Sequence, residues 1–373
     1  MTASNQTISL CMIVKDEEAT LARCLNSVKG VADEVIIVDT GSRDNTVPIA
    51  KSFGAKLYFH KWEDNFAIPR NIAIDKALGN WILILDADET LDQDSIEEVK
   101  RLTKRSDVIG FRVLIQLHPE WTEMKSVRLF RNLPTLRFTG VYHEELQVSK
   151  EMRHGFVDTG VKIIHKPFSP SDFNKKYERN MRMLKKHISL YPNSIYQMLD
   201  LSRIYLETNS LLEAEKTLNK VLLLINTEKL DEEKYKFYLI NYYKYKVHLL
   251  LKINADKRTI LSICEEALLV SPLCPLFLFH AGQMLYSLNL FERAIDYFQR
   301  CLEFKNDNYD RSIMFPKDII GADALSGMGF CYFKMHQYEE AHKFFQKAYN
   351  LKKDNNIKVM ISALRLLTQQ PRN

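Results

Sequence analysis

The chain has 373 residues, 46% of them hydrophobic and 27% charged, which is typical of a globular protein with two or three domains. The net charge of +5 is small, so it gives little support to nucleic-acid binding. Six cysteines without a CxxC pair indicate buried thiols in a reducing compartment, not a disulfide framework. The apolar runs are far shorter than the roughly 20 residues of a membrane helix, and the N-terminus lacks the pattern of a signal peptide. We therefore expect a cytoplasmic protein without a membrane span.

The first 168 residues alternate segments typical of strands and helices. Four segments have the apolar pattern of strands: ISLCMIV (8–14), EVIIVDT (34–40), AKLYFH (55–60) and WILILDAD (81–88). The segments between them have helical spacing, so the order βαβαβαβ predicts a parallel sheet with helices on both faces. Ligands gather at the carboxyl ends of such strands. Because Asp39 and Asp86 each end a strand, we expect both at that edge.

Two aspartates follow the apolar run of the fourth strand. If strand geometry persists, Asp86 and Asp88 leave on the same face, about 7 Å apart by strand rise, and can present negative charge to a cation. The alternative is a strand that runs into a turn, where aspartates are common.

The second strand also ends in polar residues. Asp39 can accept a hydrogen bond from a ribose hydroxyl or a base N–H, whereas the loop after it can instead cap the next helix through Asp44 or Asn45. Glu17, after the first strand, has the same two readings, a helix cap or a nucleoside ligand.

The second half of the chain is helical and repetitive. Three windows share a small residue, a large one three later, an alanine nine after that and a large apolar residue four further on. They are Ser202–Tyr205–Ala214–Leu218, Gly282–Leu285–Ala294–Phe298 and Gly329–Tyr332–Ala341–Phe345. This spacing resembles tetratricopeptide (TPR) repeats, in which small residues let paired helices approach closely. An ordinary helical bundle is the alternative.

The organisation expected from these patterns is an α/β domain over 1–168, a bridging helix or linker over 169–193 and TPR-like helices over 194–373. The charged segment Asp172–Leu190 has the pattern of the bridging helix, and KPFSPSD before it, with two prolines, is the expected boundary. The segment His118–Phe130 is interpreted from its position alone as a lid or an acceptor loop.

Five motifs in the first half stand in a characteristic order: LCMIVKDEE, LNSV, DEVIIVDTGSRDNT, DNFAIPRN and GNWILILDADE. They resemble family 2 glycosyltransferases of the Rossmann-like GT-A fold, over residues 8 to about 168. The resemblance is greatest to the branch with TPR repeats behind the catalytic domain, which includes peptide S-glycosyltransferases that modify bacteriocins. It implies a UDP-sugar donor, UDP-glucose or a UDP-N-acetylhexosamine, and a divalent metal, Mn²⁺ or Mg²⁺.

The same resemblance implies roles for particular residues. The donor-binding residues would be Val14, Glu17, Asp39, Ser42, Arg70 and Asp86. Asp88 would bind the metal, with His165 beside it, and a histidine ligand favours Mn²⁺ over Mg²⁺. The alternatives are a surface position for Arg70 and a structural role for His165.

The segment FTGVYHEEL matches the G-x-x-H-E segment of the same family. An inverting transfer needs one base to take the proton of the acceptor. Glu144 would be that base, with Glu145 and His143 as its neighbours.

The chain departs from its relatives at two places. It has Asp16 where they often have asparagine, and Ala67–Pro69 in place of a segment with a serine hydroxyl, which leaves the donor sugar open. The Gln-x-x-Arg-Trp motif of processive synthases is absent, which favours single transfer to a discrete acceptor.

The leading hypothesis is therefore a metal-dependent inverting glycosyltransferase that modifies a Cys, Ser or Thr side chain of a peptide. A cell-envelope glycan or lipid-linked saccharide is the alternative acceptor, and a TPR scaffold with an inactive transferase domain is a third interpretation. Because TPR-like helices often pair subunits through their exposed sides, a homodimer is one further expectation.

Overall fold

The structure is a computed structural model of the chain. It describes residues 6–142, 144–166, 173–304 and 313–369. Contacts divide the chain into two units, Met1–Pro119 with Glu123–Leu190 and Glu120–Thr122 with Tyr191–Asn373. Among the described residues, no helix is long and apolar enough to cross a membrane.

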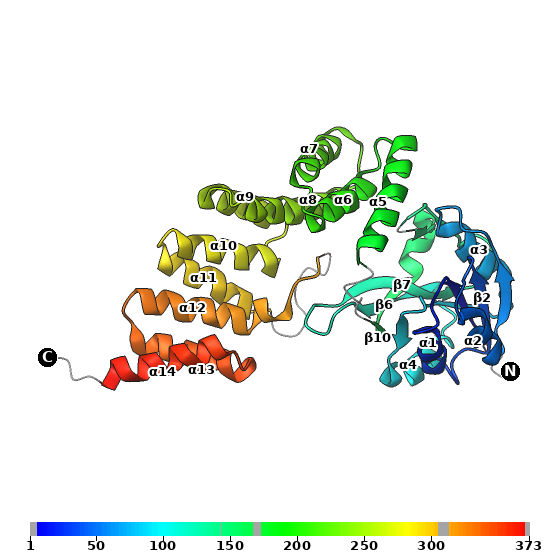
Figure 1. The fold of residues 1–373 in the computed structure, drawn as a ribbon, viewed down its shortest axis with the longest axis horizontal. Coiled ribbons are helices and arrows are strands. Elements are labelled where there is room, and N and C mark those ends of the chain that lie inside the picture. The colour runs from blue at the N-terminus through cyan, green and yellow to red at the C-terminus, as the bar shows by residue number, and fades with distance from the viewer. Residues whose placement is uncertain (1–5, 143, 167–172, 305–312, 370–373) are drawn as a thin grey trace. The chain divides into compact units, whose positions relative to one another are not determined.

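The first unit is built on an eight-stranded sheet with the strand order β3-β2-β1-β4-β7-β6-β10-β5 (Figure 1). One half consists of the parallel strands β1 (Ile8–Val14), β2 (Glu34–Asp39), β3 (Lys56–Phe59) and β4 (Trp81–Ile84). The other half consists of β5 (Glu89–Leu91), β6 (Gly110–Gln116), β7 (Met124–Arg131) and β10 (Phe156–His165). A separate pair is formed by β8 (Phe138–Thr139) and β9 (Glu145–Leu146).

The parallel arrangement is confirmed for the first four strands, but the sheet as a whole is mixed. Strand β7 runs antiparallel to both β4 and β6, and β5 runs antiparallel to β10. The antiparallel pairing of β6 and β7 follows from the short connection between them, because parallel neighbours need a long crossover connection and antiparallel neighbours do not. The segment His118–Phe130 is thus largely strand β7, not a lid.

Helices cover both faces of the sheet, as expected. They are α1 (Leu21–Ser27), α2 (Thr46–Ser52), α3 (Ala67–Asp75) and α4 (Ile96–Leu102), with the short 3-10 helices Gln93–Ser95 and Lys150–Gly155, whereas α5 (Phe173–Leu190) contacts loops of the same unit. Side chains alternate along a strand, so Leu10 of β1 packs with Leu21 of α1 on one face, and Cys11 packs with Ala73 of α3 on the other. Helix α5, expected as a bridge between the two halves, groups with the first unit. The segment 167–172 before it lies outside the described residues.

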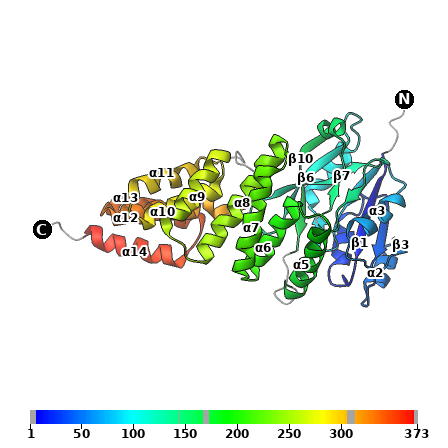
Figure 2. The same cartoon turned by 90° about the horizontal axis from the view of Figure 1, so that it is seen from above.

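The second unit is a succession of antiparallel helices (Figure 2). They are α6 (Ile195–Glu207), α7 (Leu211–Thr227), α8 (Glu232–Lys252), α9 (Lys257–Val270), α10 (Pro275–Ser287), α11 (Phe291–Leu302), α12 (Ala322–Lys334), α13 (Tyr338–Leu351) and α14 (Asn355–Gln369), with the short 3-10 helix Lys317–Ile320. Each consecutive helix packs on the next, and the small residues of the repeat pattern are buried in these contacts. Residues Glu120–Thr122 belong to this unit, in which the Thr122 amide donates to the Phe315 carbonyl (3.0 Å).

Candidate functional site

Polar side chains gather at the carboxyl edge of the four parallel strands. Asp39 is the last residue of β2, whereas β4 ends at Ile84, before the two aspartates. Asp86 opens a turn in which its carbonyl accepts from the Glu89 amide (3.0 Å). Of the two readings for Asp86 and Asp88, the structure has the turn and not the continued strand, because the chain turns back there into β5. The turn nevertheless keeps both aspartates at the edge where ligands bind in such sheets.

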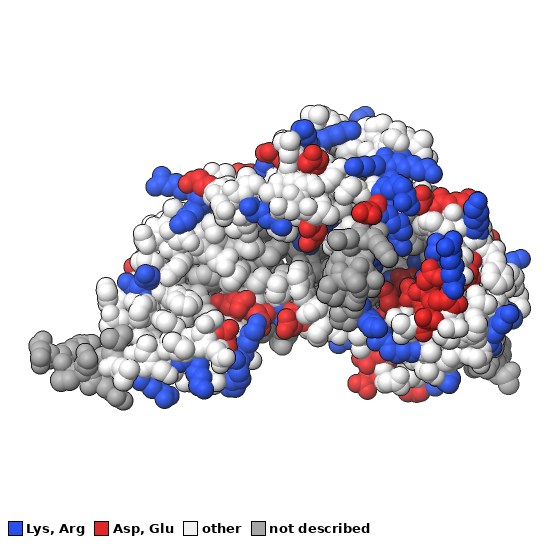
Figure 3. Space-filling view, in the orientation of Figure 1, with Lys and Arg blue, Asp and Glu red and all other residues white. Residues whose placement is uncertain are grey.

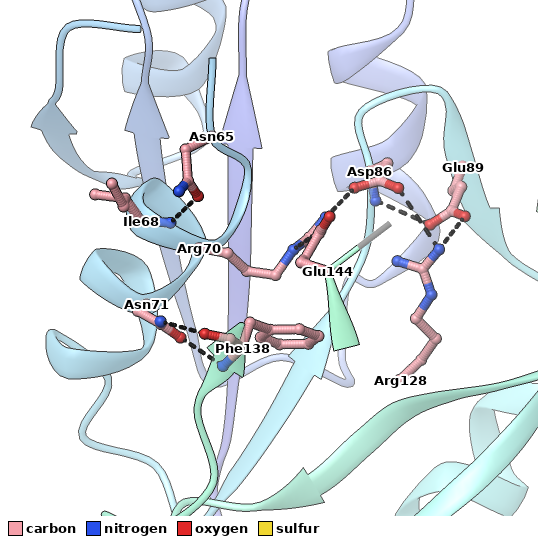
Figure 4. A network of polar contacts seen from close by, with 9 residues as sticks. All are labelled: Asn65, Ile68, Arg70, Asn71, Asp86, Glu89, Arg128, Phe138 and Glu144. Carbon is pink, nitrogen blue, oxygen red and sulfur yellow. Dashed lines mark hydrogen bonds and ion pairs between the residues drawn. The ribbon is translucent and has the colours of Figure 1, made fainter. Parts of the chain in front are cut away.

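Arg70 of α3 connects two of the expected site residues. Its Nη2 lies 3.1 Å from Asp86 Oδ1, and its Nε lies 2.7 Å from Glu144 Oε1 (Figure 4). Only 6% of the Arg70 side chain is exposed, so it is not a surface arginine. Desolvation lowers the pKa of Arg70, but Glu144 and Asp86 outweigh it and raise that pKa above its ordinary value. Arg70 therefore remains a cation between the carboxylates.

A second arginine, Arg128 of β7, lies on the other side of Asp86 (Figure 4). Its Nη2 is 2.9 Å from Glu89 Oε1 and 3.5 Å from Asp86 Oδ2. Desolvation raises the pKa of Asp86, but Arg70 and Arg128 together hold it well below its usual range. Burial raises the pKa of Glu89 to about 7, although Arg128 opposes this effect.

Sequence reasoning missed Arg128 and Glu89. The segment that contains Arg128 was interpreted as a loop, and in a loop an arginine carries no signal. Arg128 lies between the apolar residues Val127 and Leu129 in a segment that forms a strand. A charged side chain among apolar neighbours in a strand is the signal that would have indicated a site residue here.

Asp88 and His165 meet at the same edge. His165, the last residue of β10, places Nε2 3.1 Å from Asp88 Oδ2. Burial lowers the pKa of His165, but its hydrogen bond to Asp88 outweighs burial and raises that pKa above the ordinary value. One carboxylate and one imidazole fit a divalent cation whose other ligands are phosphate and water oxygens. Among the residues that the structure describes, no group of three or more His, Cys, Asp and Glu side chains is arranged to hold a metal.

The loop after β2 supports both readings of its residues. Asp39 Oδ1 accepts from the amides of Gly41 (2.9 Å) and Ser42 (3.0 Å). Its Oδ2 is buried and has no hydrogen-bond partner within the described part of the chain, so this oxygen can still accept a hydrogen bond. Asp44, by contrast, accepts from the amides of Thr46 and Glu18 and orders the start of α2.

The remaining expected donor residues lie close by but are engaged within the protein. Ser42 Oγ accepts from the Asp16 amide (2.9 Å), and the buried Val14, at the end of β1, accepts at its carbonyl from the Thr40 amide (3.0 Å). Glu17 Oε2 accepts from the Thr20 hydroxyl (2.5 Å), and burial raises the pKa of Glu17.

Glu144 and Glu145 follow β8, Glu144 just before β9 and Glu145 as its first residue. Glu144 is mostly buried, with 11% of its side chain exposed, whereas Glu145 begins β9 and is exposed. His143 lies outside the described residues.

Comparison with known proteins supports both halves of the architecture. A family model described as glycosyl transferase family 2 matches residues 9–168, and two tetratricopeptide-repeat models match residues 277–308 and 322–355.

Relatives among curated proteins match parts of the chain. A TPR repeat-containing protein of Synechococcus elongatus is 47% identical over 143 residues, which are 37% of this chain and 34% of that protein. The SPbeta prophage-derived glycosyltransferase SunS of Bacillus subtilis is 27% identical over 197 residues, 50% of this chain and 46% of that protein. An uncharacterized glycosyltransferase of Rickettsia typhi is 43% identical over 93 residues, 25% of this chain and 32% of that protein. The chain thus spans between a third and a half of the length of these relatives.

Solved structures match parts of the chain at low identity. The crystal structure of MamA has 17% identity and a TM-score of 0.38, over 49% of this chain and 93% of that chain. Glucosyl-3-phosphoglycerate synthase from Mycobacterium tuberculosis, with Mn²⁺, UDP and glucosyl-3-phosphoglycerate, has 16% identity and a TM-score of 0.37, over 45% of this chain and 75% of that chain.

Proposed function

We propose that the chain transfers one sugar from a UDP-sugar to a peptide side chain, with inversion at the anomeric carbon. The proposal is supported by the match of residues 9–168 to the glycosyl transferase family 2 model and by the TPR models that match further along the chain. The observation that carries this proposal is the convergence of Asp39, Asp86, Asp88 and Glu144 on one edge of the sheet, with Arg70 between Asp86 and Glu144.

Each side chain has a part in donor binding. The buried Oδ2 of Asp39 accepts from the uracil ring, and Asp86, kept ionised by two arginines, accepts from the ribose hydroxyls. Asp88 and His165 hold a divalent metal, Mn²⁺ or Mg²⁺. When bound, that cation neutralises the negative charge that grows on the diphosphate as the sugar leaves.

Glu144 is the base in this proposal. Arg70 fixes its carboxylate by the 2.7 Å contact, and the second carboxylate oxygen takes the proton of the acceptor as it attacks the anomeric carbon. The TPR repeats favour a peptide acceptor, because such repeats present extended surfaces for protein segments. A cysteine, serine or threonine is the acceptor residue.

The direct test is transfer from UDP-glucose, UDP-galactose and UDP-N-acetylglucosamine, with Mn²⁺, to peptides that each contain one Cys, Ser or Thr. Intact-mass spectrometry should find one added sugar on one acceptor type. Glu144→Gln should slow transfer about 100-fold or more while UDP still binds, and Glu151→Gln, an exposed carboxylate elsewhere, should change nothing. A larger loss in Glu145→Gln than in Glu144→Gln would assign the base to Glu145. If none of the donors gives sugar transfer or UDP release, the proposal is contradicted.

A further inference from the structure

Helix α5 brings positive charge to the acidic edge of the first unit. Figure 3 shows lysine and arginine side chains gathered over this helix, next to a patch of acidic side chains. Lys176 is half-buried, and the carboxylates that act on its ammonium group are Asp88, Asp86 and Glu17. These carboxylates follow β4 and β1, so the Lys176 ammonium lies within electrostatic range of the carboxyl edge of the sheet.

Helix α5 is fixed in this position by contacts to the loops around the site. Arg182 forms an ion pair with Asp64 (2.8 Å), and Asn180 Nδ2 donates to the Tyr142 hydroxyl (2.7 Å). The guanidinium carbon of Arg179 lies 5.4 Å from the centre of the Phe66 ring. Phe66 precedes α3, which carries Arg70, and Tyr142 lies in the loop that carries Glu144, so the helix is anchored on both sides of the expected acceptor base.

Lys176 and Arg179 are three residues apart and therefore neighbours on one face of the helix. Both are half-buried, and Glu17 acts electrostatically on both. Two cations with restricted access to water thus lie over carboxylates that are themselves expected to receive a nucleotide.

A bound nucleotide would bring negative charge that the arginines of the site do not offset. Arg70 and Arg128 are already paired with Asp86, Glu89 and Glu144, so they offset charge that belongs to the protein. A diphosphate adds further negative charge beside Asp88, which one divalent cation offsets only in part.

We propose that Lys176 binds the diphosphate of the nucleotide donor, with Arg179 beside it, so that α5 is a wall of the donor site. This inference rests on the proposed glycosyl transfer. In that reaction the bond between the anomeric carbon and the β-phosphate oxygen breaks, the acceptor bonds to the carbon, and the acceptor proton goes to Glu144. The electron pair of the broken bond stays on the β-phosphate oxygen, and the Lys176 ammonium stabilises the charge that develops there.

Calorimetric titration of UDP and of uridine, both with Mn²⁺, tests the role of Lys176. Lys176→Met should weaken UDP binding about 10-fold to 100-fold, the effect of losing one charge-assisted hydrogen bond. It should change uridine binding by less than about twofold, since uridine has no phosphate. Lys176→Arg should recover most of the affinity for UDP.

Lys186→Met is the matched control, because Lys186 is exposed and lies ten residues further along the same helix, about 15 Å away by helical rise. It should bind UDP as the unaltered chain does. If the unaltered chain binds UDP and Lys176→Met binds it equally well, or if uridine and UDP weaken together, the role of Lys176 is wrong while the proposed transferase stands. If the unaltered chain binds no nucleoside diphosphate, the proposed function and this inference both fail.

Discussion

Asp86 lies between arginines from two different elements, Arg70 of α3 and Arg128 of β7. The Asp86 carboxylate accepts a hydrogen bond from Arg70 and forms an ion pair with Arg128, and the two contacts together favour one orientation, because each guanidinium has a fixed planar geometry. The same arrangement leaves Glu89 dependent on Arg128, since only 2% of the Glu89 side chain is exposed. Removal of one arginine therefore affects the fold as well as the site.

Arg128→Met should lower the free energy of unfolding of the first unit by about 3 kcal/mol, because it leaves the buried Glu89 carboxylate without its cation. Urea denaturation measures this loss. Arg112→Met is the control: its partner Asp158 is 48% exposed, so we expect a change of less than about 1 kcal/mol. The double variant Arg128→Met with Glu89→Met should recover part of the loss. Equal effects of the Arg128 and Arg112 substitutions would contradict this account.

Sequence reasoning at this scale found the residues that end strands and missed those that reach the site from elsewhere. Asp39 and Asp86 could be placed because a polar residue after a buried strand marks the sheet edge. Arg128 could not, because its strand was not recognised. For Lys176 the helix was expected, but its approach to Asp88 depends on tertiary packing that helical periodicity does not encode.

The helices of the second unit are joined by a turn that recurs at the same place. Asn209, Asn254, Asn289 and His336 all have a positive φ, between 49° and 62°, just after the first helix of each pair. Asparagine tolerates this left-handed conformation better than most residues, so it suits these positions.

Gly282 shows why the repeats need small residues. A Cβ there would lie 2.8 Å from the Phe298 ring, and a Cβ at Gly327 of α12 would lie 2.7 Å from the same ring. The Phe298 ring thus packs closely on glycines of two helices.

Gly282→Ala should lower the free energy of unfolding of the second unit by about 1–2 kcal/mol, because overpacking outweighs the gain in helix propensity. Thermal denaturation of the unaltered chain, Gly282→Ala, Phe298→Leu and the double variant forms a double-mutant cycle. In that background the alanine should be neutral or stabilising. The same loss in both backgrounds would show that the contact with Phe298 is not the cause.

Lys244 of α8 gives the second unit a pH-dependent stability. Burial lowers its pKa to about 8 from an ordinary value of 10.5, and the nearby Arg203 lowers it further. The folded protein therefore disfavours the charged form. Below pH 8, Lys244 is protonated in both the folded and the unfolded chain, so the full cost of burying its charge lowers the stability. Between about pH 8 and 10.5 the unfolded chain binds more protons than the folded one, so the stability rises with pH.

Lys244→Met should raise the Tm of this unit at pH 7 by about 2–4 °C, for a gain of about 1 kcal/mol. The gain should shrink as the pH rises from 8 towards 10.5. Lys236→Met, an exposed lysine of the same helix, should show no such trend. Identical pH profiles for the two variants would rule out a special environment at Lys244.

At the element scale, the strands and helices with strong periodicity were predictable. The first four strands and the three repeat windows appear in the structure where the sequence places them. The second half of the sheet was not predicted, because β5 has only three residues and the antiparallel position of β7 follows from a hairpin, not from its own pattern.

At the scale of the whole molecule, the two units have different relatives and different chemistry. The glycosyltransferase family model ends at residue 168, and the repeat models begin at residue 277. The clustered carboxylates and arginines described above all belong to the first unit. Donor binding is therefore the central claim, and it can be tested before the acceptor is known.

The most direct measurement is calorimetric titration of UDP into the full chain with Mn²⁺, with Mg²⁺ and with EDTA, beside Asp88→Ala and the exposed control Asp94→Ala. We expect binding that requires a divalent metal, that Asp88→Ala abolishes and that Asp94→Ala leaves intact. No binding of UDP with either metal, or binding that neither EDTA nor Asp88→Ala reduces, would contradict the metal-dependent donor site proposed here.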